Sequence, residues 1–385
     1  MGISIDRPFT VRTLTDLVRI NSINPALEAG GPGEAAAAAY VADVLRNLGL
    51  DVEVYESAPG RPSVVGRLTG KSRGRRLMLN GHIDTVGVAG MPEPFSGEVR
   101  DGKLYGRGAY DMKGSVAACI GAAKALVDAR APFRGEVLVA AVADEENASI
   151  GTADVVRHQR VDAAIVTEPT QLDLCLAHKG FVWIEVETLG RAAHGSRPDL
   201  GVDANMAMGR VLAGLAALEA ELRRRPSHPL VGAPSLHAAQ IFGGTARSVY
   251  AAHCKLTVER RTVPGETEEG VLAEVQAILE RVAAADPAFR GSCTATLARG
   301  PFEVARDAEI VRTVATAAQR VLGRSPALGG QTPWMDAALL AAAGVETVVF
   351  GPAGTGAHAA EEWVDVDSVV SCAQVLAESV LAYCH

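Results

Sequence analysis

Strand-like and helix-like segments alternate through the first half of the chain, and this alternation limits the possible folds more than any other feature of the sequence. Apolar residues at helical spacing predict helices, and alternating or short buried apolar runs predict strands. The predicted elements are helices over 33–50 and 112–129 and strands over 51–57, 75–81, 135–144 and 162–168. Strands separated by helices in this way predict an α/β sheet with helices on its faces.

Near Gly180 the pattern changes to a different order of elements. The prediction there is a strand over 181–190, a helix over 202–225, strands over 235–244 and 253–263, a helix over 267–285 and a strand over 293–298. This β-α-β-β-α-β order is typical of a small ferredoxin-like domain. Beyond residue 298 the first pattern resumes. We therefore expect a mixed-sheet α/β domain over 1–179 and 298–385, with a ferredoxin-like α+β domain, 180–297, inserted into it.

The charge balance and the apolar pattern exclude several classes of partner. The formal net charge is −8 and the longest basic run is Arg223–Arg225, whereas a nucleic-acid-binding protein needs a basic surface. The amino terminus lacks the regions of a secretory signal, and no uncharged apolar run reaches about 18 residues, so we expect neither export nor a membrane span. The six cysteines include no CxxC pair, which is typical of reduced thiols, and we expect a cytoplasmic protein.

Two short motifs match functional patterns but lack the structural context that those patterns need. GKSRG (70–74) fits G-x-S-x-G, in which a nucleophilic serine lies between a strand and a helix. A strand follows Ser72 here, so we interpret this segment as a solvated hairpin loop. GRLTGKS (66–72) is one residue shorter than a P-loop and precedes no helix that could receive a phosphate.

The strand predicted over 75–81 leads into a histidine and an aspartate two residues apart. Residues two apart in an extended chain share a face, so Asp84 can hold one ring N–H of His82 while the other ring nitrogen binds a metal ion. A surface His–Asp pair fits the same two residues, because a metal site needs further ligands.

Two further segments place carboxylates where a site could form. In GRGAYDMKGS, Asp111 lies between glycines at the start of a predicted helix, either as a helix cap or beside a closely approaching group. Another predicted strand ends in Asp144, Glu145 and Glu146. Three like charges at the end of a buried strand are costly unless a cation offsets them, although a solvated charged loop also fits.

Glu168 follows the predicted strand in IVTEPT, and His358, in GTGAHAAEEW, follows another strand that is predicted over 346–352. Sites in open α/β sheets form at the carboxyl ends of the strands, so we expect these side chains to meet those near His82. Mixed histidine and carboxylate ligands suit Zn²⁺, Co²⁺ or Mn²⁺. This number of acidic ligands predicts two ions that share a carboxylate.

Several segments, spread in order over nearly the whole chain, resemble the M20 family of metallo-aminoacylases and peptidases, which includes acetylornithine deacetylase, succinyl-diaminopimelate desuccinylase and glutamate carboxypeptidase. They are GHIDTV, GRGAYDMKG, DEE, TEPT, AAHGSRPDLGVDA, ERRTVPGET and GPAGTGAHAAEEW. The resemblance implies a mixed-sheet metallopeptidase catalytic domain. It also implies that the inserted ferredoxin-like domain acts as a lid and joins two chains in a homodimer.

The same resemblance implies ligands for two divalent metal ions, with Zn²⁺ preferred over Co²⁺ or Mn²⁺. His82 and Glu168 would bind one ion. Glu146 and His358 would bind the other, and Asp111 would bridge the two.

Other positions carry implied roles in catalysis. Glu145 would act as the general base, and Asp84 would orient the ring of His82. His194, in the inserted domain, would reach the active site of a partner subunit and stabilise the oxyanion, so that closure completes the site. Arg261, in ERRTVPGE, would pair with a substrate carboxylate.

One segment departs from the family pattern. In GGTARSVYAAHC the family usually carries an asparagine followed by two apolar residues and a proline, whereas this chain has Ser248 and Ala251. That asparagine commonly helps to hold the substrate carboxylate, so we expect altered substrate recognition. Arg247 is either a replacement for it or an ordinary surface residue.

These observations predict a metal-dependent amidohydrolase that cleaves an N-acyl-L-amino acid, like acetylornithine deacetylase, and releases a carboxylate and the free amino acid. A desuccinylase and a glutamate-type carboxypeptidase or dipeptidase remain alternatives. These enzymes differ only in pocket size and in which side of the amide carries the anchored carboxylate, and the sequence does not decide either point. A metal-bound protein without activity is a further alternative, which predicts a damaged base or ligand, whereas all six positions are intact in this sequence. The expected partners are a small-molecule substrate and a second copy of the chain, with no nucleic acid and no membrane.

Overall fold

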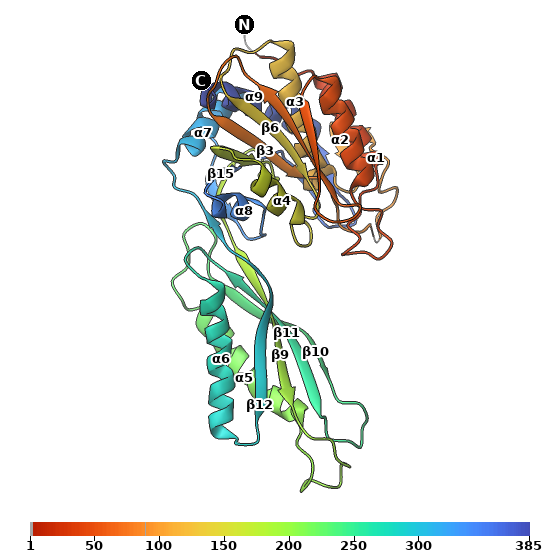
Figure 1. The fold of residues 1–385 in the computed structure, drawn as a ribbon, viewed down its shortest axis with the longest axis vertical. Coiled ribbons are helices and arrows are strands. Elements are labelled where there is room, and N and C mark those ends of the chain that lie inside the picture. Colours follow the sequence, from red (N-terminus) through yellow and green to blue (C-terminus); the bar gives the residue numbers. More distant parts are fainter. Residues whose placement is uncertain (1–2, 89) are drawn as a thin grey trace. The chain divides into compact units, whose positions relative to one another are not determined.

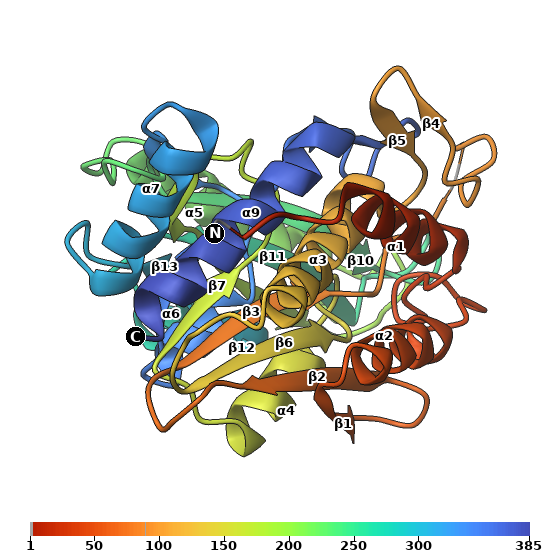
Figure 2. The ribbon, with the colours of Figure 1, turned by 90° about the horizontal axis from the view of Figure 1, so that it is seen from above.

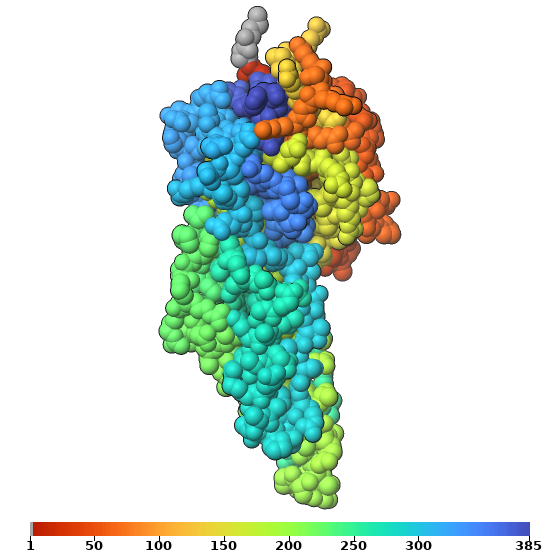
Figure 3. Space-filling view, turned by 60° about the vertical axis from the view of Figure 1, so that its left-hand side comes forward, coloured from red at the N-terminus to blue at the C-terminus, as the bar shows by residue number. Residues whose placement is uncertain are grey.

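Both ends of the chain fold into one unit, and the middle of the chain folds into another. The protein is described here by a computed structural model that covers residues 3–88 and 90–385. Unit 1 comprises Met1–Leu176, Val304–Gly329 and Met335–His385, and unit 2 comprises Ala177–Glu303 and Gly330–Trp334. In Figure 3 the red-to-yellow and blue segments belong to unit 1, and most of the green and cyan segments belong to unit 2.

Unit 1 is an α/β domain built on a mixed sheet (Figure 1), which confirms the predicted fold class. Its helices are α1 (Arg7–Arg19), α2 (Ala35–Asn47), α3 (Gly114–Asp128) with the π-helical turn η1 (Ala109–Lys113) before it, α4 (Ile150–His158), α7 (Glu309–Leu322), α8 (Ala337–Ala342) and α9 (Val366–Tyr383). The strands of its main sheet are β1 (Asp51–Glu56), β2 (Pro62–Thr69), β3 (Arg76–His82), β6 (Glu136–Val142), β7 (Ala163–Val166), β8 (Leu174–His178), β14 (Leu328–Gln331) and β15 (Glu346–Val349). They pair in the order β1-β2-β6-β3-β7-β15-β8, with β14 also on β8, and the last two residues of β8 and of β14 are assigned to unit 2. A separate small sheet contains β4 (Val99–Arg100), β5 (Lys103–Tyr105), β16 (Gly354–Thr355) and β17 (Trp363–Asp365).

Helices cover both faces of the main sheet, as Figure 2 shows. On one face α3 and α9 pack against each other and against β3, with α1 against α3 and α7 against α9. On the other face α4 contacts β2 and β6, and α8 contacts α4. Because β3 lies between both layers, its residues Leu77, Met78 and Leu79 are fully buried.

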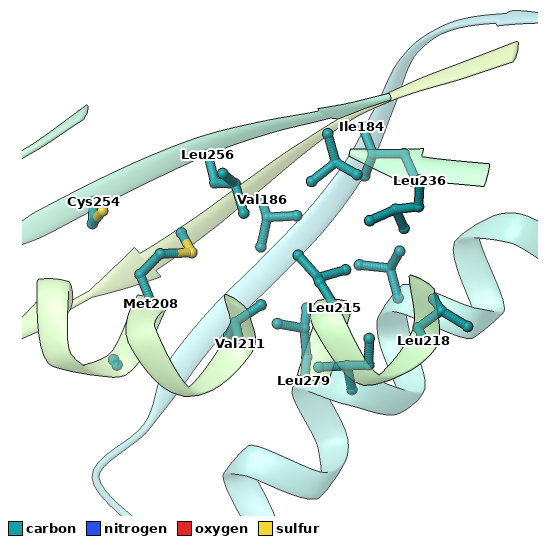
Figure 4. Packing of buried hydrophobic residues seen from close by; sticks show 14 of the residues in the cluster. Ile184, Val186, Met208, Val211, Leu215, Leu218, Leu236, Cys254, Leu256 and Leu279 are labelled. Atoms are coloured by element: carbon teal, nitrogen blue, oxygen red, sulfur yellow. The ribbon is translucent and has the colours of Figure 1, made fainter. Parts of the chain in front are cut away.

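Unit 2 has the predicted ferredoxin-like order of elements. They are β9 (Gly180–Leu189), α5 (Ala204–Leu222), β10 (Ser235–Gly243), β11 (His253–Thr262), α6 (Glu268–Ala285) and β12 (Arg290–Arg299), followed by the short β13 (Phe302–Glu303). The four long strands form an antiparallel sheet in the order β10-β11-β9-β12. In Figure 4, Leu215 of α5 and Leu279 of α6 pack in one apolar cluster with Ile184 and Leu256 of the sheet.

The two long helices of unit 2 begin at residues that cap them. The Asp203 side chain accepts hydrogen bonds from the backbone N–H groups of Asn205 and Met206 at the start of α5. The Thr267 side chain accepts one from Gly270 N at the start of α6. These bonds satisfy N–H groups that have no partner within the helix, which is why both helices begin where they do.

The boundary between the units lies a few residues away from the one expected from the sequence. β13 pairs with the end of β8, and the ring of Trp334 packs edge-on against His178. The segments 177–179, 298–303 and 330–334 therefore belong to unit 2, whereas the sequence-based boundary placed them in the other domain.

α9 is the only helix in residues 3–88 and 90–385 that is long and apolar enough to cross a membrane. It contains Asp367 and Glu378, and 61% of it is buried inside the protein, so we assign it to the core of unit 1. The six cysteines are free thiols.

Candidate metal centre

The segments that follow four parallel strands meet at one edge of the main sheet in unit 1. β3 pairs in parallel with β6 and β7, and β7 pairs in parallel with β15. The carboxyl ends of all four strands therefore lie together, as expected for a site in an open α/β sheet. β3 ends at His82, and the segments after the other three strands carry Glu145, Glu146, Glu168 and His358.

Five of the predicted residues form a single cluster at this edge. His82, Glu145 and Glu168 offer ligand atoms that all lie within 4.8 Å of one another, and so do His82, Asp111 and Glu146. His82 belongs to both groups, since its Nε2 lies 3.1 Å from Asp111 Oδ1 and 3.6 Å from Glu168 Oε1. The cluster therefore consists of two overlapping groups of atoms of the kinds that ligate metal ions.

His358 joins this cluster beside Asp111. Its Nε2 lies 2.9 Å from Glu146 Oε2 and 3.4 Å from Asp111 Oδ2. The other oxygen of Asp111 faces His82. One carboxylate thus contacts both histidines through different oxygens, which is the placement that a bridging carboxylate needs.

The ring of His82 is held chiefly by the main chain. His82 Nδ1 donates a hydrogen bond to the carbonyl oxygen of Asp84 at 3.0 Å, whereas the nearest carboxylate oxygen of Asp84 lies 3.6 Å away. The predicted contact between the two side chains is thus the longer of the two. With the proton on Nδ1, Nε2 can serve as a metal ligand.

The Asp84 carboxylate holds the backbone of the two glutamates instead. Its Oδ1 accepts a hydrogen bond from Glu145 N at 3.1 Å, and its Oδ2 accepts one from Glu146 N at 3.2 Å. Asn24 Nδ2 donates a third bond to Oδ2 at 2.8 Å. Asp84 and Asn24 are fully buried, so no water competes for these bonds.

Asp144 turns away from the cluster. Its backbone is left-handed, with φ 67°, and its carboxylate accepts hydrogen bonds from Asn24 Nδ2 at 2.9 Å and Arg61 Nη2 at 2.8 Å. Of the three consecutive carboxylates, only Glu145 and Glu146 therefore reach the cluster. Neither Asn24 nor Arg61 was predicted from the sequence as a site residue, because neither lies at the end of a predicted strand or beside a histidine.

Two further buried carboxylates, Asp336 and Glu362, border the cluster, and neither was predicted from the sequence as a site residue. Burial raises the pKa of Asp336 to about 6, and its charge in turn raises the pKa of Glu145. Glu362 follows His358 in the chain and accepts a hydrogen bond from the backbone N–H of Asp111. Glu362 lies within the motif GAHAAEEW, which was recognised in the sequence, but nothing in the motif indicates that its side chain binds the backbone at Asp111.

Carboxylates outnumber histidines in this cluster, and the titration of its members reflects the excess of negative charge. Burial, together with repulsion from Glu168, raises the pKa of Glu145 well above its usual value. Burial, together with the charge of Asp111, raises the pKa of Glu146 to about 7. Hydrogen bonds to Asp111 and Glu146 raise the pKa of His358 to about 10. Bound cations would replace the protons that these groups retain.

The donor set fits divalent metal ions. Imidazole nitrogens and carboxylate oxygens together are the ligands that Zn²⁺, Co²⁺ and Mn²⁺ accept. Glu146 Oε1 is buried and lacks a hydrogen-bond partner, although buried polar atoms are nearly always paired. A cation in the cluster would supply that missing partner.

His194 and Arg261, the two remaining predicted site residues, belong to unit 2. His194 is exposed, and its Nδ1 accepts a hydrogen bond from Ser196 N at 3.2 Å. The next residue, Gly195, donates its N–H to the carbonyl oxygen of Ser248 at 2.7 Å. The segment with the unusual serine therefore supports the loop that carries His194.

Arg261 lies on β11 and is partly buried. Its guanidinium pairs with Glu259 and lies 5.4 Å from the centre of the Phe181 ring. The neighbouring Arg260 is fully buried and pairs with Glu266. Of the two consecutive arginines, Arg261 is thus the one with exposed surface for a ligand.

Comparisons with known proteins agree with this geometry. The model of peptidase family M20/M25/M40 matches residues 78–382. An acetylornithine deacetylase from Myxococcus xanthus is 33% identical over 325 residues, which cover 82% of each chain. An N-formyl-4-amino-5-aminomethyl-2-methylpyrimidine deformylase from Bacillus subtilis (strain 168) is 27% identical over 378 residues, which cover 90% of this chain and 88% of the other. Among solved structures, a dinuclear metal binding peptidase of the M20 family from Bacillus subtilis has a TM-score of 0.75 at 18% identity, with 98% of both chains covered.

Proposed function

Because the chain belongs to peptidase family M20/M25/M40, we propose that it uses two divalent metal ions to hydrolyse the amide bond of an N-acyl-L-amino acid. One observation carries the proposal, namely that the two oxygens of the Asp111 carboxylate face two different histidines, His82 and His358. Glu168 lies beside His82, and Glu146 lies beside His358. This arrangement suits two ions that lie close together and share a carboxylate.

We assign His82 and Glu168 to one ion. Glu146 and His358 belong to the other, and Asp111, whose two oxygens face the two histidines, lies between them. Zn²⁺ is the first candidate because histidine and carboxylate are its common ligands in hydrolases, and Co²⁺ and Mn²⁺ are alternatives. Ions held here would polarise the amide carbonyl and lower the pKa of water.

Glu145 is the proposed general base. Its Oε2 lies 3.9 Å from His82 Nε2, within the cluster, and burial raises its pKa, which makes the carboxylate a stronger base once bound cations have displaced its proton. Glu145 takes a proton from the attacking water and passes it to the leaving amine nitrogen. The bond from its backbone N–H to Asp84 keeps the side chain in the cluster.

Unit 2 supplies two further groups. Because Nδ1 of His194 accepts a hydrogen bond from Ser196 N, a neutral ring carries its proton on Nε2. That proton can be donated to the oxygen that becomes negative as the carbonyl is attacked. Arg261 offers a planar guanidinium that pairs with a substrate carboxylate through two parallel bonds.

The proposed assembly is a cytoplasmic homodimer joined through unit 2. β10 is an edge strand of the four-stranded sheet, and its Ile241 and Phe242 are 51% and 65% exposed. An unpaired edge with exposed apolar side chains favours pairing with a second chain. In that dimer His194 acts at the active site of the partner subunit, so a fully active monomer would contradict this part of the proposal.

A second candidate is hydrolysis of an N-formyl or other amide whose amine part lacks an α-carboxylate. The deformylase relative matches 90% of this chain, and Ser248 stands where the family usually has a carboxylate-holding asparagine. N-succinyl amino acids and dipeptides are further alternatives within the family.

The test is a panel of N-acetyl, N-succinyl and N-formyl amides and dipeptides, assayed before and after chelation. We expect hydrolysis of an N-acetyl-L-amino acid, loss of activity on chelation, and recovery with Zn²⁺ or Co²⁺. Preferred hydrolysis of a formyl amide without an α-carboxylate would favour the second candidate. Full activity in metal-free protein would refute the metal-dependent mechanism for every substrate in the panel.

A further inference from the structure

We propose that the buried ion pair between Arg107 and Glu362 positions the metal ligands Asp111 and His358 relative to each other. The inference rests on the proposed function, because it requires those two residues to bind metal. Arg107 and Glu362 act through the backbone next to each ligand, so they are positioning residues and not ligands themselves.

Glu362 accepts several hydrogen bonds from the backbone of the loop that carries Asp111. Its Oε1 accepts hydrogen bonds from Tyr110 N at 2.9 Å and Asp111 N at 3.0 Å. Its Oε2 accepts one from Gly108 N at 3.1 Å and one from Arg107 Nη1 at 2.6 Å. The side chain of Glu362 is completely buried, so water does not compete for these bonds.

Arg107 extends the same contact to the segment that carries His358. Its Nη2 donates to the carbonyl oxygen of Ala359, the residue after His358, at 2.9 Å. Its Nε donates to the carbonyl oxygen of Gly87 at 3.0 Å. Only 3% of the Arg107 side chain is exposed, so each of these bonds is made away from water.

Arg107 and Glu362 therefore connect the backbone at Asp111 to the backbone next to His358. Asp111 and His358 are far apart in the sequence, yet His358 Nε2 lies 3.4 Å from Asp111 Oδ2. Metal affinity depends closely on the positions of the ligands. Residues that orient the ligands therefore affect the affinity even though they do not touch the metal ion. Glu362 sets the Asp111 side of this contact, and Arg107 sets the His358 side.

Glu362→Gln is a sharp perturbation because every hydrogen-bond partner of the Glu362 carboxylate is an N–H donor. Whichever way the amide is turned, its NH₂ group faces two N–H donors, either those of Tyr110 and Asp111 or those of Gly108 and Arg107. The variant must therefore lose two bonds at one end of the side chain. Glu361, the adjacent residue, is exposed, so Glu361→Gln is a matched control with the same chemical change.

The experiment titrates metal-free protein with Co²⁺ and follows visible absorption, competition with a chelator, and thermal unfolding. For Glu362→Gln we expect affinity for at least one of the two ions to fall about 10- to 100-fold, with an altered cobalt spectrum. At saturating Co²⁺ we expect a lower kcat with KM little changed. Glu361→Gln should match the wild type in every measurement.

Two outcomes separate the inference from the proposed function. Wild-type protein that binds no Co²⁺ would overturn the proposed function itself. Wild-type protein that binds two ions, with Glu362→Gln equal to it in affinity and spectrum, would overturn only the positioning role, even if the variant unfolds at a lower temperature.

Arg107→Lys keeps the inference testable if Glu362→Gln does not fold. Lysine retains the charge opposite Glu362, but a single nitrogen cannot reach Glu362, Gly87 and Ala359 together as the guanidinium does. We expect this variant to weaken Co²⁺ binding about 10-fold, because the charge opposite Glu362 remains. If Arg107→Lys binds Co²⁺ as tightly as the wild type, the positioning role is wrong.

Discussion

Asp84→Asn tests what the buried Asp84 carboxylate does. In the structure this carboxylate accepts hydrogen bonds from the backbone N–H groups of Glu145 and Glu146 and from the side-chain amide of Asn24. The backbone carbonyl oxygen of Asp84 separately accepts a hydrogen bond from His82 Nδ1. Asparagine keeps that carbonyl and the shape of the side chain. Its own amide must place an NH₂ group where one carboxylate oxygen now accepts.

The cost follows from which oxygen is lost. Oδ2 accepts two hydrogen bonds and Oδ1 accepts one. The favoured orientation of the asparagine amide therefore keeps its oxygen at the Oδ2 position. Its NH₂ group then takes the Oδ1 position and faces the N–H of Glu145, so that hydrogen bond is lost. A buried hydrogen bond to a charged group contributes about 1.5–3 kcal/mol. At about 1.36 kcal/mol per tenfold change in rate, displacement of Glu145 lowers kcat about 10- to 160-fold.

The assay measures kcat, KM and Co²⁺ affinity of Asp84→Asn with the best substrate of the panel. We expect kcat to fall as calculated and Co²⁺ affinity to change less than about threefold, because the main-chain bond to His82 survives. If the Asp84 carboxylate instead orients the ring of His82, Co²⁺ affinity should fall about 10- to 100-fold. That result, or an unchanged kcat, would refute the reasoning from these hydrogen bonds.

Three other predictions concern the base, the metal and the core of unit 2. Glu145→Gln should lower kcat by about 10²- to 10⁴-fold while cobalt titration still shows two bound ions; normal turnover would exclude Glu145 as the base. Removing metal should destabilise the protein more at high pH, as seen in the melting temperature with and without Co²⁺ from about pH 5.5 to pH 8. Burial and Asp111 raise the pKa of Glu146 to about 7, so its contribution to the stability of the metal-free protein is fully present below the unfolded-state pKa of 4.5 and is lost as pH rises through about 7. A difference in melting temperature that does not vary with pH would contradict this. Leu215→Ala should lower the free energy of unfolding of unit 2 by about 2–5 kcal/mol, measured by denaturant titration, because Leu215 is 2% exposed in the apolar cluster; a loss below about 1 kcal/mol would mean that the cluster is loosely packed.

Local periodicity predicted most of the elements that shape the fold, but not all of them. The helices α5 and α6 and the strands between them follow clear patterns, and the ferredoxin-like order could be read directly. α1, α4, α8 and α9 were not predicted. For α9 the local signals are present in the sequence: Val366–Tyr383 is amphipathic to about the same degree as α5 and α6, and Asp365 caps the helix by accepting a hydrogen bond from Ser368 N.

The sequence by itself determined which chemistry this protein can carry out. His82, Glu146, Glu168 and His358 follow buried strands, and parallel strands bring their carboxyl ends to one edge, so local pattern and one topological rule were enough to predict the cluster. Asp111, preceded by glycines, was identified with them through the family motif.

Only the tertiary structure decided which side chain holds which. Asp144 and Glu145 are neighbours with the same charge, yet the left-handed backbone at Asp144 directs one to Arg61 and the other to the cluster around His82. Asn24 bonds to Asp84 across 60 positions, and Glu362 bonds to Gly108 N across 254. Such partners are chosen by burial, where each donor must find an acceptor because water is excluded, and no local pattern in the chain records that choice.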